Sequence, residues 1–229
     1  MNKVEVAINN EVVKAITKGR ERTNILRTVE QKSIVYLVQR IPSWLSSNML
    51  TAIGLFGNLI VFLSFLLGAY VNNYFLLLNV FGFIISWFGD SLDGRIAFYR
   101  KIPRKWYGFT LDLTVDWIGT IFIGLGFMIY VSSPWTLIGY AFIVLYGWAM
   151  ITAILRYKIT GKYSIDSGLL GPTEVRVIIS SIMILELLVN GSIVYCGVLV
   201  SLVLLITNII DFRKLLVLAD DRDTLERQN

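Results

Sequence analysis

The sequence predicts an all-α polytopic membrane protein, a six-transmembrane-helix bundle preceded by an N-terminal amphipathic surface helix. The first observation is composition: 55% of the 229 residues are hydrophobic, and the mean hydropathy of +0.67 is too high for an ordinary soluble domain. The second is length. A helix needs roughly 20 apolar residues to cross about 30 Å of hydrocarbon, and the chain contains several such stretches. The third is that charged residues gather between these stretches.

The first element is a polar cytoplasmic segment, residues 1–45, in which we see no cleavable signal peptide. Within it, residues 24–45 place apolar and charged residues at helical spacing. Because Lys and Arg accompany the apolar face, the pattern favours a helix lying on the membrane surface, with Trp44 near the headgroups. A soluble helix packed on the bundle is the alternative.

Six apolar stretches follow and define one membrane catalytic domain, residues 46–212, before a cytoplasmic tail at 213–229. The predicted spans are residues 46–69, 73–93, 109–131, 134–155, 174–190 and 192–212. All four prolines lie at the edges of these spans or between them, which supports the boundaries.

The distribution of Lys and Arg predicts the orientation of the bundle. These residues occur before the first span, after the second, after the fourth and in the tail, whereas the other three connections contain no charged residue. By the positive-inside rule, both termini are cytoplasmic, and so is a cluster of four aspartates within residues 90–116. The net charge of +5 fits contact with anionic lipid headgroups. It does not indicate nucleic-acid binding, because the basic residues sit at helix ends rather than in an aromatic-laced patch.

Four aspartates are the strongest functional signal in the chain. Asp90, Asp93, Asp112 and Asp116 fall within GDSLDGRIAFYRKIPRKWYGFTLDLTVDW, beside strongly apolar sequence where an ionised carboxylate is costly. Spacings of three and four residues place each pair on one face of a helix. Two such faces turned toward each other would form an oxygen-rich cage suited to Mg²⁺.

Such a cage suits phosphoryl transfer. Two metal ions held about 3.5–4 Å apart by shared carboxylates clamp a diphosphate and neutralise charge on the leaving group. Because the chain contains no His, acid–base chemistry falls to carboxylates, Lys, Tyr or water. The small residues Gly94, Ala97 and Gly108 would let a substrate approach the backbone closely.

These residues resemble the signature of the CDP-alcohol phosphotransferases, D-x-x-D-G-x-x-A-R followed after eight residues by G-x-x-x-D-x-x-x-D. The matching positions are Asp90, Asp93, Gly94, Ala97, Gly108, Asp112 and Asp116. The sequence departs from the pattern in two ways. Phe98 stands where the family has Arg, and the stretch between that position and Gly108 is one residue longer than in the family. Arg95 or Arg100 could supply the missing cation. The family's P-N-x-x-T element is also present in part, as Asn48 and Thr51 with Ser47 in place of Pro.

The resemblance implies a role for each matched residue. Asp90, Asp93, Asp112 and Asp116 would ligate two Mg²⁺ or Mn²⁺ ions, and Asp116 would also be the catalytic general base. The nucleotide would lie against Asn48, Thr51, Gly94, Ala97 and Gly108. The donor would be CDP-diacylglycerol or another CDP-alcohol, and CMP would be released. A homodimer in the bacterial inner membrane, with its active site facing the cytoplasm, is also implied.

The acceptor is predicted from charge. Arg156, Lys158 and Arg176 lie around the cytoplasmic ends of the fourth and fifth spans, and Arg matches phosphate well. We therefore expect a small polyol acceptor, phosphorylated as in glycerol 3-phosphate or inositol phosphate. The alternative is that these cations only set the orientation of the bundle in the membrane. Glu186, a carboxylate inside the fifth span, either contacts substrate or bonds a neighbouring helix.

Three other readings are open to the sequence. A membrane prenyltransferase also uses paired aspartate motifs, but it needs a longer chain and a different spacing. A small cation transporter would place carboxylates along a path across the membrane, whereas these four lie toward one side. A degenerate family member, inactivated by Phe98, is the third.

Overall fold

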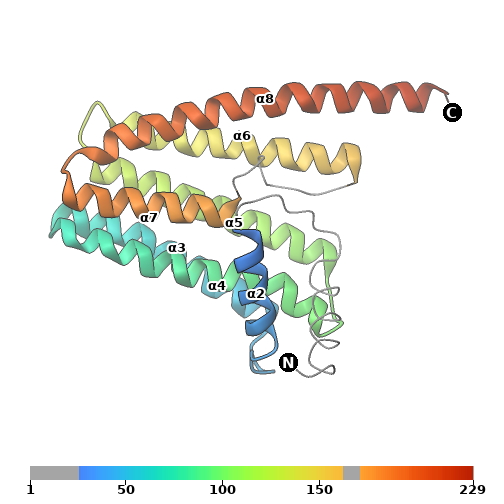
Figure 1. Ribbon diagram of the computed structural model, residues 1–229, viewed down its shortest axis with the longest axis horizontal. Helices are drawn as coiled ribbons and strands as arrows, with labels where there is room; N and C mark the ends of the chain where they lie inside the picture. Colours follow the sequence, from blue (N-terminus) through green and yellow to red (C-terminus); the bar gives the residue numbers. More distant parts are fainter. Residues whose placement is uncertain (1–25, 162–170, 229) are drawn as a thin grey trace.

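The computed structural model describes residues 26–161 and 171–228, and every regular element within them is helical (Figure 1). This confirms the all-α prediction. The elements are α2 (Arg27–Val38), α3 (Ser47–Tyr70), the 3₁₀ helix η1 (Asn73–Leu77), α4 (Leu78–Tyr99), α5 (Lys105–Tyr130), α6 (Thr136–Thr160), α7 (Pro172–Leu188) and α8 (Ser192–Gln228). The helices α3 to α8 run side by side as a bundle, and α2 crosses one end of it.

Five helices of the described chain are long and apolar enough to cross a membrane: α3, η1 with α4, α5, α6 and α8. The sixth predicted span falls on α7, which has only 17 residues. At 1.5 Å per residue α7 is about 26 Å long, somewhat less than the hydrocarbon thickness. Length and composition therefore support five of the six predicted spans, and α7 lies beside them in the bundle.

The last helix is longer than the sequence predicts. We expected the sixth span to end near residue 212, but α8 continues through the tail to Gln228 and projects past α6 in Figure 1. Polar contacts tie the two helices together: Asn208 donates to the Leu145 carbonyl at 2.8 Å, and Arg222 donates to the Lys158 and Ile159 carbonyls at 2.7 and 3.0 Å. Arg222 thus satisfies carbonyls at the C-terminal end of α6, which has no further helical turn to do so.

The N-terminal helix packs on the bundle. Ile34, Val35 and Val38 of α2 are buried against Leu92 and Ile96 of α4. This is the contact expected of a helix docked on the bundle, and Val29 and Tyr36 on its other side are exposed. A membrane-surface position of α2 remains a prediction. Most of the segment 1–45, including the start of the amphipathic stretch at 24–25, lies outside the described residues.

The aspartate-bearing part of α4 is fixed by a close crossing with α3. An added Cβ at Gly89 would lie 2.3 Å from the Gly54 nitrogen and 2.4 Å from the Leu50 carbonyl oxygen. At Gly57 it would lie 2.3 Å from the Ser86 nitrogen. Only glycine allows backbones to approach this closely, as is common between membrane helices. The crossing at Gly89 sets the position of Asp90, the next residue.

Glu186 bonds a neighbouring helix rather than lining a pocket. Its buried carboxylate accepts hydrogen bonds from the backbone nitrogens of Gly191 and Ile193 at 2.9 and 2.8 Å. The hydroxyls of Ser192 and Tyr130 donate to it at 3.2 Å each. A helix start leaves backbone N–H groups without partners, and Glu186 satisfies them for α8. The structure thus favours the second of the two roles predicted for this residue.

We expect Glu186→Ala to lower the free energy of unfolding by roughly 2–3 kcal/mol, because it leaves buried donors without an acceptor. Glu186→Gln, which keeps one acceptor oxygen, should cost less. Thermal unfolding in detergent would measure both. Turnover per folded molecule should be unchanged, since the α7–α8 turn lies at the end of the bundle away from α2 (Figure 1). A selective loss of turnover with unaltered stability would contradict the capping role.

Candidate active site

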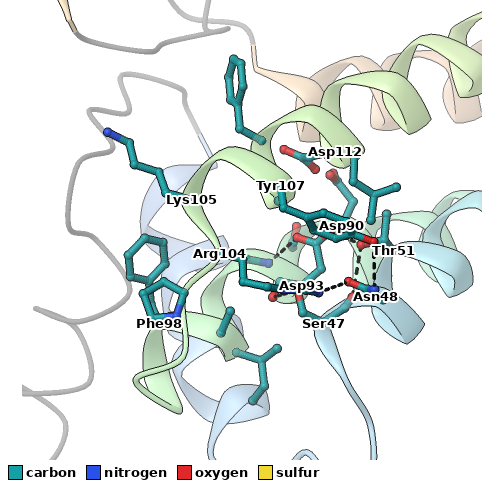
Figure 2. Close-up of a pocket in the computed structure, with 18 of the residues that line it drawn as sticks. Ser47, Asn48, Thr51, Asp90, Asp93, Phe98, Arg104, Lys105, Tyr107 and Asp112 are labelled. Carbon is teal, nitrogen blue, oxygen red and sulfur yellow. Dashed lines mark hydrogen bonds between the residues drawn. The ribbon is translucent and has the colours of Figure 1, made fainter.

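A pocket of about 760 Å³ opens at the end of the bundle where α2 lies, and Figure 2 shows residues that line it. Its walls come from the starts of α3, α5 and α7, the end of α4 and the α4–α5 connection, with Glu30 of α2 and Tyr157 of α6 at its edges. The predicted metal and nucleotide residues all line it: Asn48, Thr51, Asp90, Asp93, Gly94, Ala97, Gly108, Asp112 and Asp116. The structure therefore gathers both halves of the sequence motif around one cavity.

Three of the four aspartates form a compact group. Asp90 of α4 and Asp112 and Asp116 of α5 each offer a carboxylate oxygen, and these atoms lie within 4.8 Å of one another. Oxygen ligands sit about 2.0–2.6 Å from Mg²⁺ or Ca²⁺, so two ligands of one ion are at most about 5 Å apart. Carboxylates at this separation fit a hard divalent cation.

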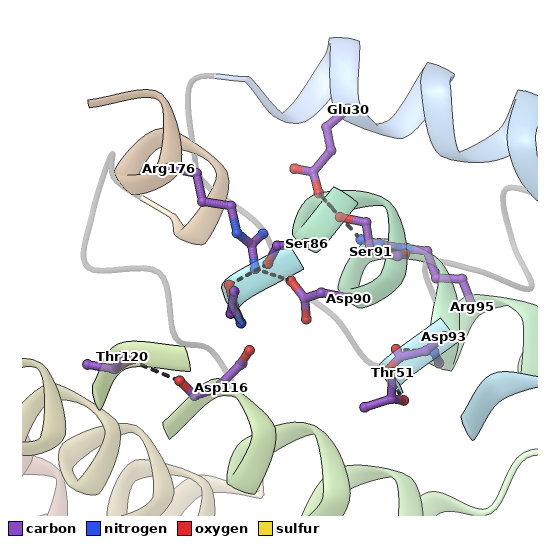
Figure 3. Close-up of polar contacts among 12 residues, drawn as sticks. Glu30, Thr51, Ser86, Asp90, Ser91, Asp93, Arg95, Asp116, Thr120 and Arg176 are labelled. Atoms are coloured by element: carbon purple, nitrogen blue, oxygen red, sulfur yellow. Dashed lines mark hydrogen bonds and ion pairs between the residues drawn. The ribbon is translucent and has the colours of Figure 1, made fainter. Parts of the chain in front are cut away.

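Asp93 lies in the same pocket but turns toward α3. Its carboxylate is buried and accepts a hydrogen bond from the Thr51 hydroxyl at 2.7 Å (Figure 3), and another from the Gly94 backbone nitrogen. The Ser47 hydroxyl donates to the Asp93 carbonyl at 2.8 Å. Ser47 and Thr51 in the first turn of α3 thus orient this aspartate, which explains why Thr51 accompanies the main motif.

Arg176 is a cation in direct contact with the aspartate group. It extends from the first turns of α7, and its Nη2 donates to Asp90 Oδ2 at 2.7 Å (Figure 3). Its side chain is only 13% exposed. The guanidinium has five N–H donors, so it can hold Asp90 and still bind an anion in the pocket.

The other two predicted acceptor residues do not line the pocket. Arg156 faces α8, where its Nη2 lies 3.9 Å from Asp211 Oδ2. Lys158 lies one turn from the end of α6, where its carbonyl accepts from Arg222. Of the three cations predicted to bind the acceptor, Arg176 is the one that lines this pocket.

Two buried glutamates hold the surrounding elements together. Glu174 of α7 accepts from the Leu26 nitrogen at 2.8 Å and from the Gly171 nitrogen at 3.0 Å. Glu30 of α2 lies 3.9 Å from Arg95 on α4 (Figure 3). Both contacts join α2 to helices that carry the site, so α2 forms part of the pocket wall.

Sequence reasoning missed a group at the mouth of the pocket. Arg104 Nη2 donates to Asn48 Oδ1 at 2.6 Å, and Asn48 Nδ2 donates to the Tyr107 hydroxyl at 3.2 Å. The guanidinium also stacks over the Tyr107 ring at 4.1 Å. In the sequence, Arg104 is one of four cations at 100–105, which we used only to predict the orientation of the bundle in the membrane. The feature that could have separated Arg104 from the others is the aromatic pair Trp106 and Tyr107 that follows it.

Helices of membrane length around a carboxylate-lined pocket define a polytopic membrane protein with an acidic site at one end. The model of the CDP-alcohol phosphatidyltransferase family matches residues 44–207, more than half of the chain, and the chain belongs to this family. It is therefore an integral membrane enzyme of phospholipid biosynthesis, a transferase of substituted phosphate groups. The family uses divalent metal ions, which agrees with the donor set of Asp90, Asp112 and Asp116. No curated protein sequence matches the chain.

Proposed function

We propose that this transferase moves a phosphatidyl group from CDP-diacylglycerol to a hydroxyl of a small phosphorylated polyol, such as glycerol 3-phosphate or inositol 1-phosphate. The observation that carries the proposal is the aspartate group with Arg176 beside it in a single pocket. The acceptor oxygen attacks the β-phosphorus of the donor. The bond from that phosphorus to the bridging oxygen breaks, and CMP leaves with the electron pair.

Two Mg²⁺ or Mn²⁺ ions would be held by Asp90, Asp112 and Asp116, with Asp93 as the fourth ligand. When bound, such ions neutralise the diphosphate and lower the pKa of a hydroxyl. Thr51 supports this assignment, because its hydrogen bond to Asp93 Oδ2 fixes the orientation of that carboxylate. Residues that orient ligands in this way are a regular part of metal sites.

Asp116 takes the proton of the acceptor hydroxyl. It stands one helical turn deeper on α5 than Asp112 and belongs to the same oxygen group. With His absent from the chain, a carboxylate in contact with the reacting oxygen is the base best matched to this chemistry.

The nucleotide lies against Asn48, Thr51, Gly94, Ala97 and Gly108. Gly108 supports this placement, because an added Cβ there would meet no heavy atom within 4 Å. A glycine in open space is not required by packing, so close approach of a substrate gives it a role.

The acceptor's phosphate binds Arg176. This cation is nearly buried, lines the pocket and sits next to the aspartate group, so a phosphate on it would bring the polyol hydroxyls toward Asp116. Arg suits phosphate because its planar guanidinium offers paired N–H donors to two phosphate oxygens.

The setting we propose is the cytoplasmic face of a bacterial inner membrane, with the enzyme a homodimer. Lys and Arg at the pocket end of the bundle support this orientation through the positive-inside rule. The donor's acyl chains then remain in lipid while its diphosphate enters the pocket.

The central experiment supplies purified protein with Mg²⁺ or Mn²⁺, labelled CDP-diacylglycerol and a panel of acceptors, and measures CMP release. We expect release with a phosphorylated polyol. Release with a neutral alcohol only would overturn the acceptor assignment. A folded protein that releases no CMP with any acceptor would favour a degenerate member or a small cation transporter.

We expect Arg176→Gln to raise the KM for a phosphorylated acceptor by roughly 10- to 100-fold, the loss of one charged hydrogen bond. The KM for a neutral analogue of the same polyol should change little. Arg213→Gln, at an exposed position on α8, is the matched control. Equal increases for both acceptors would show that Arg176 acts only by holding Asp90.

A further inference from the structure

The segment from the last turn of α4 to the first turn of α5 departs from the family motif twice, at Phe98 and by one additional residue before Gly108. Phe98 lines the pocket, so an apolar ring occupies the position of the motif arginine. A guanidinium at that position would offer paired donors to a diphosphate, and the Phe98 ring offers none.

The two cations that the sequence suggested as replacements, Arg95 and Arg100, are engaged in holding the fold. Arg95 is buried, donates to the Ser91 carbonyl and lies 3.9 Å from Glu30. Arg100 donates to the Leu45 and Pro42 carbonyls at 2.7 and 2.8 Å, which secures the chain ahead of α3. Arg95 does not line the pocket, and Arg100 lines it with both terminal nitrogens bound to backbone carbonyls.

Arg104 is placed differently. It lines the pocket at the residue that precedes α5, and Figure 2 shows it directed toward Asn48 and Tyr107. Its bond to Asn48 Oδ1, at 2.6 Å, uses Nη2, and its plane stacks on Tyr107. Stacking and one hydrogen bond pre-orient the guanidinium while leaving donor capacity for a phosphate oxygen.

The path of the connection brings Arg104 to this position. After α4, the Lys101 nitrogen donates to the Phe98 carbonyl at 3.1 Å, and Lys101 itself has a φ of 59°, in the left-handed region. The Ile102 nitrogen then donates to the Ala97 carbonyl at 3.0 Å. This tight reversal turns the chain back so that Arg104 meets the first turn of α3 at Asn48.

We propose that Arg104 binds the diphosphate of the CDP-alcohol donor and replaces the arginine that the motif lacks at position 98. The two departures from the motif are then one change: the cation has moved from the end of α4 to the start of α5, and the additional residue allows the move. This inference rests on the proposed function, because it assumes a cytidine diphosphate donor in this pocket.

The test measures the affinity of the full-length protein for CDP in detergent with Mg²⁺, by calorimetry. Arg104→Gln should weaken binding by roughly 10- to 100-fold, as expected for a hydrogen bond to a charged group. Adding Phe98→Arg to that variant should restore most of the affinity, because it returns the guanidinium to the motif position. Lys101→Gln, which removes a cation from the same connection outside the pocket, is the matched control and should bind as the wild type.

Wild-type affinity in Arg104→Gln would overturn the inference and leave the proposed function standing. A loss that neither Phe98→Arg nor Arg104→Lys recovers, together with a lower Tm, would assign Arg104 to the structure of the connection and also overturn it. Failure of the wild-type protein to bind CDP at all would instead remove the proposed function.

Discussion

Asp116→Asn should lower turnover at least about 100-fold while the protein keeps its fold. General-base catalysis contributes roughly 10²- to 10⁴-fold, and Asn can neither accept the proton nor carry the ligand charge. Asp116 is half-buried on α5 within the three-carboxylate group, and Asn has nearly the same shape, so packing should be preserved. CMP release at saturating donor and acceptor measures the effect.

Metal dependence separates the two roles of Asp116. If the residue is a ligand only, raising Mn²⁺ should recover the rate of Asp116→Asn; if it is also the base, the rate should stay low at saturating metal. Asp223→Asn, exposed on α8, is the charge-matched control and should behave as the wild type. Full turnover in Asp116→Asn would rule out its assignment as the base.

Gly89→Ala should destabilise the bundle more than any other single methyl group added near the site. The new Cβ would lie 2.3 Å from the Gly54 nitrogen and 2.4 Å from the Leu50 oxygen. Both are backbone atoms of α3, so no side chain can rotate away. Overpacking typically costs 1–3 kcal/mol, and we expect roughly 3 kcal/mol or more. For a chain of this length that corresponds to a fall in Tm of roughly 6–12 °C.

Gly108→Ala is the informative comparison, because the same methyl group meets nothing within 4 Å there. It should leave Tm unchanged and weaken CDP binding, whereas Gly89→Ala should lower Tm first. A wild-type Tm in Gly89→Ala would mean that α3 and α4 cross less closely than described.

The sequence was most informative where helical geometry alone decides the outcome. Residues three or four apart share a helix face, so the spacing of four predicted that Asp112 and Asp116 lie together on α5. The expectation that the two aspartate-bearing faces turn toward each other, which spacing alone does not decide, is met by Asp90 of α4. The same rule could not place Asp93 accurately. A spacing of three leaves Asp93 about 60° from Asp90 around α4, and its carboxylate accepts a hydrogen bond from the Thr51 hydroxyl on α3.

Contacts between distant segments were beyond the sequence. Arg156 and Arg176 look alike in a charge pattern, yet the first faces Asp211 on α8 and the second faces Asp90. The positive-inside rule predicts on which side a cation lies, not what it touches. The length of α8 was missed because its tail is polar, and the Arg222 contacts with the end of α6 become visible only in three dimensions.

The glycine crossing next to Asp90 also bears on how this site can diverge. One half of the pocket is built on α3 and α4, where an atom added at Gly57 or Gly89 would meet the backbone of the other helix. The other half is the connection at 100–104, where most side chains are exposed. The two halves therefore tolerate substitution differently: a methyl group added at Gly89 meets the backbone of α3, whereas the exposed side chains of the connection have room to change.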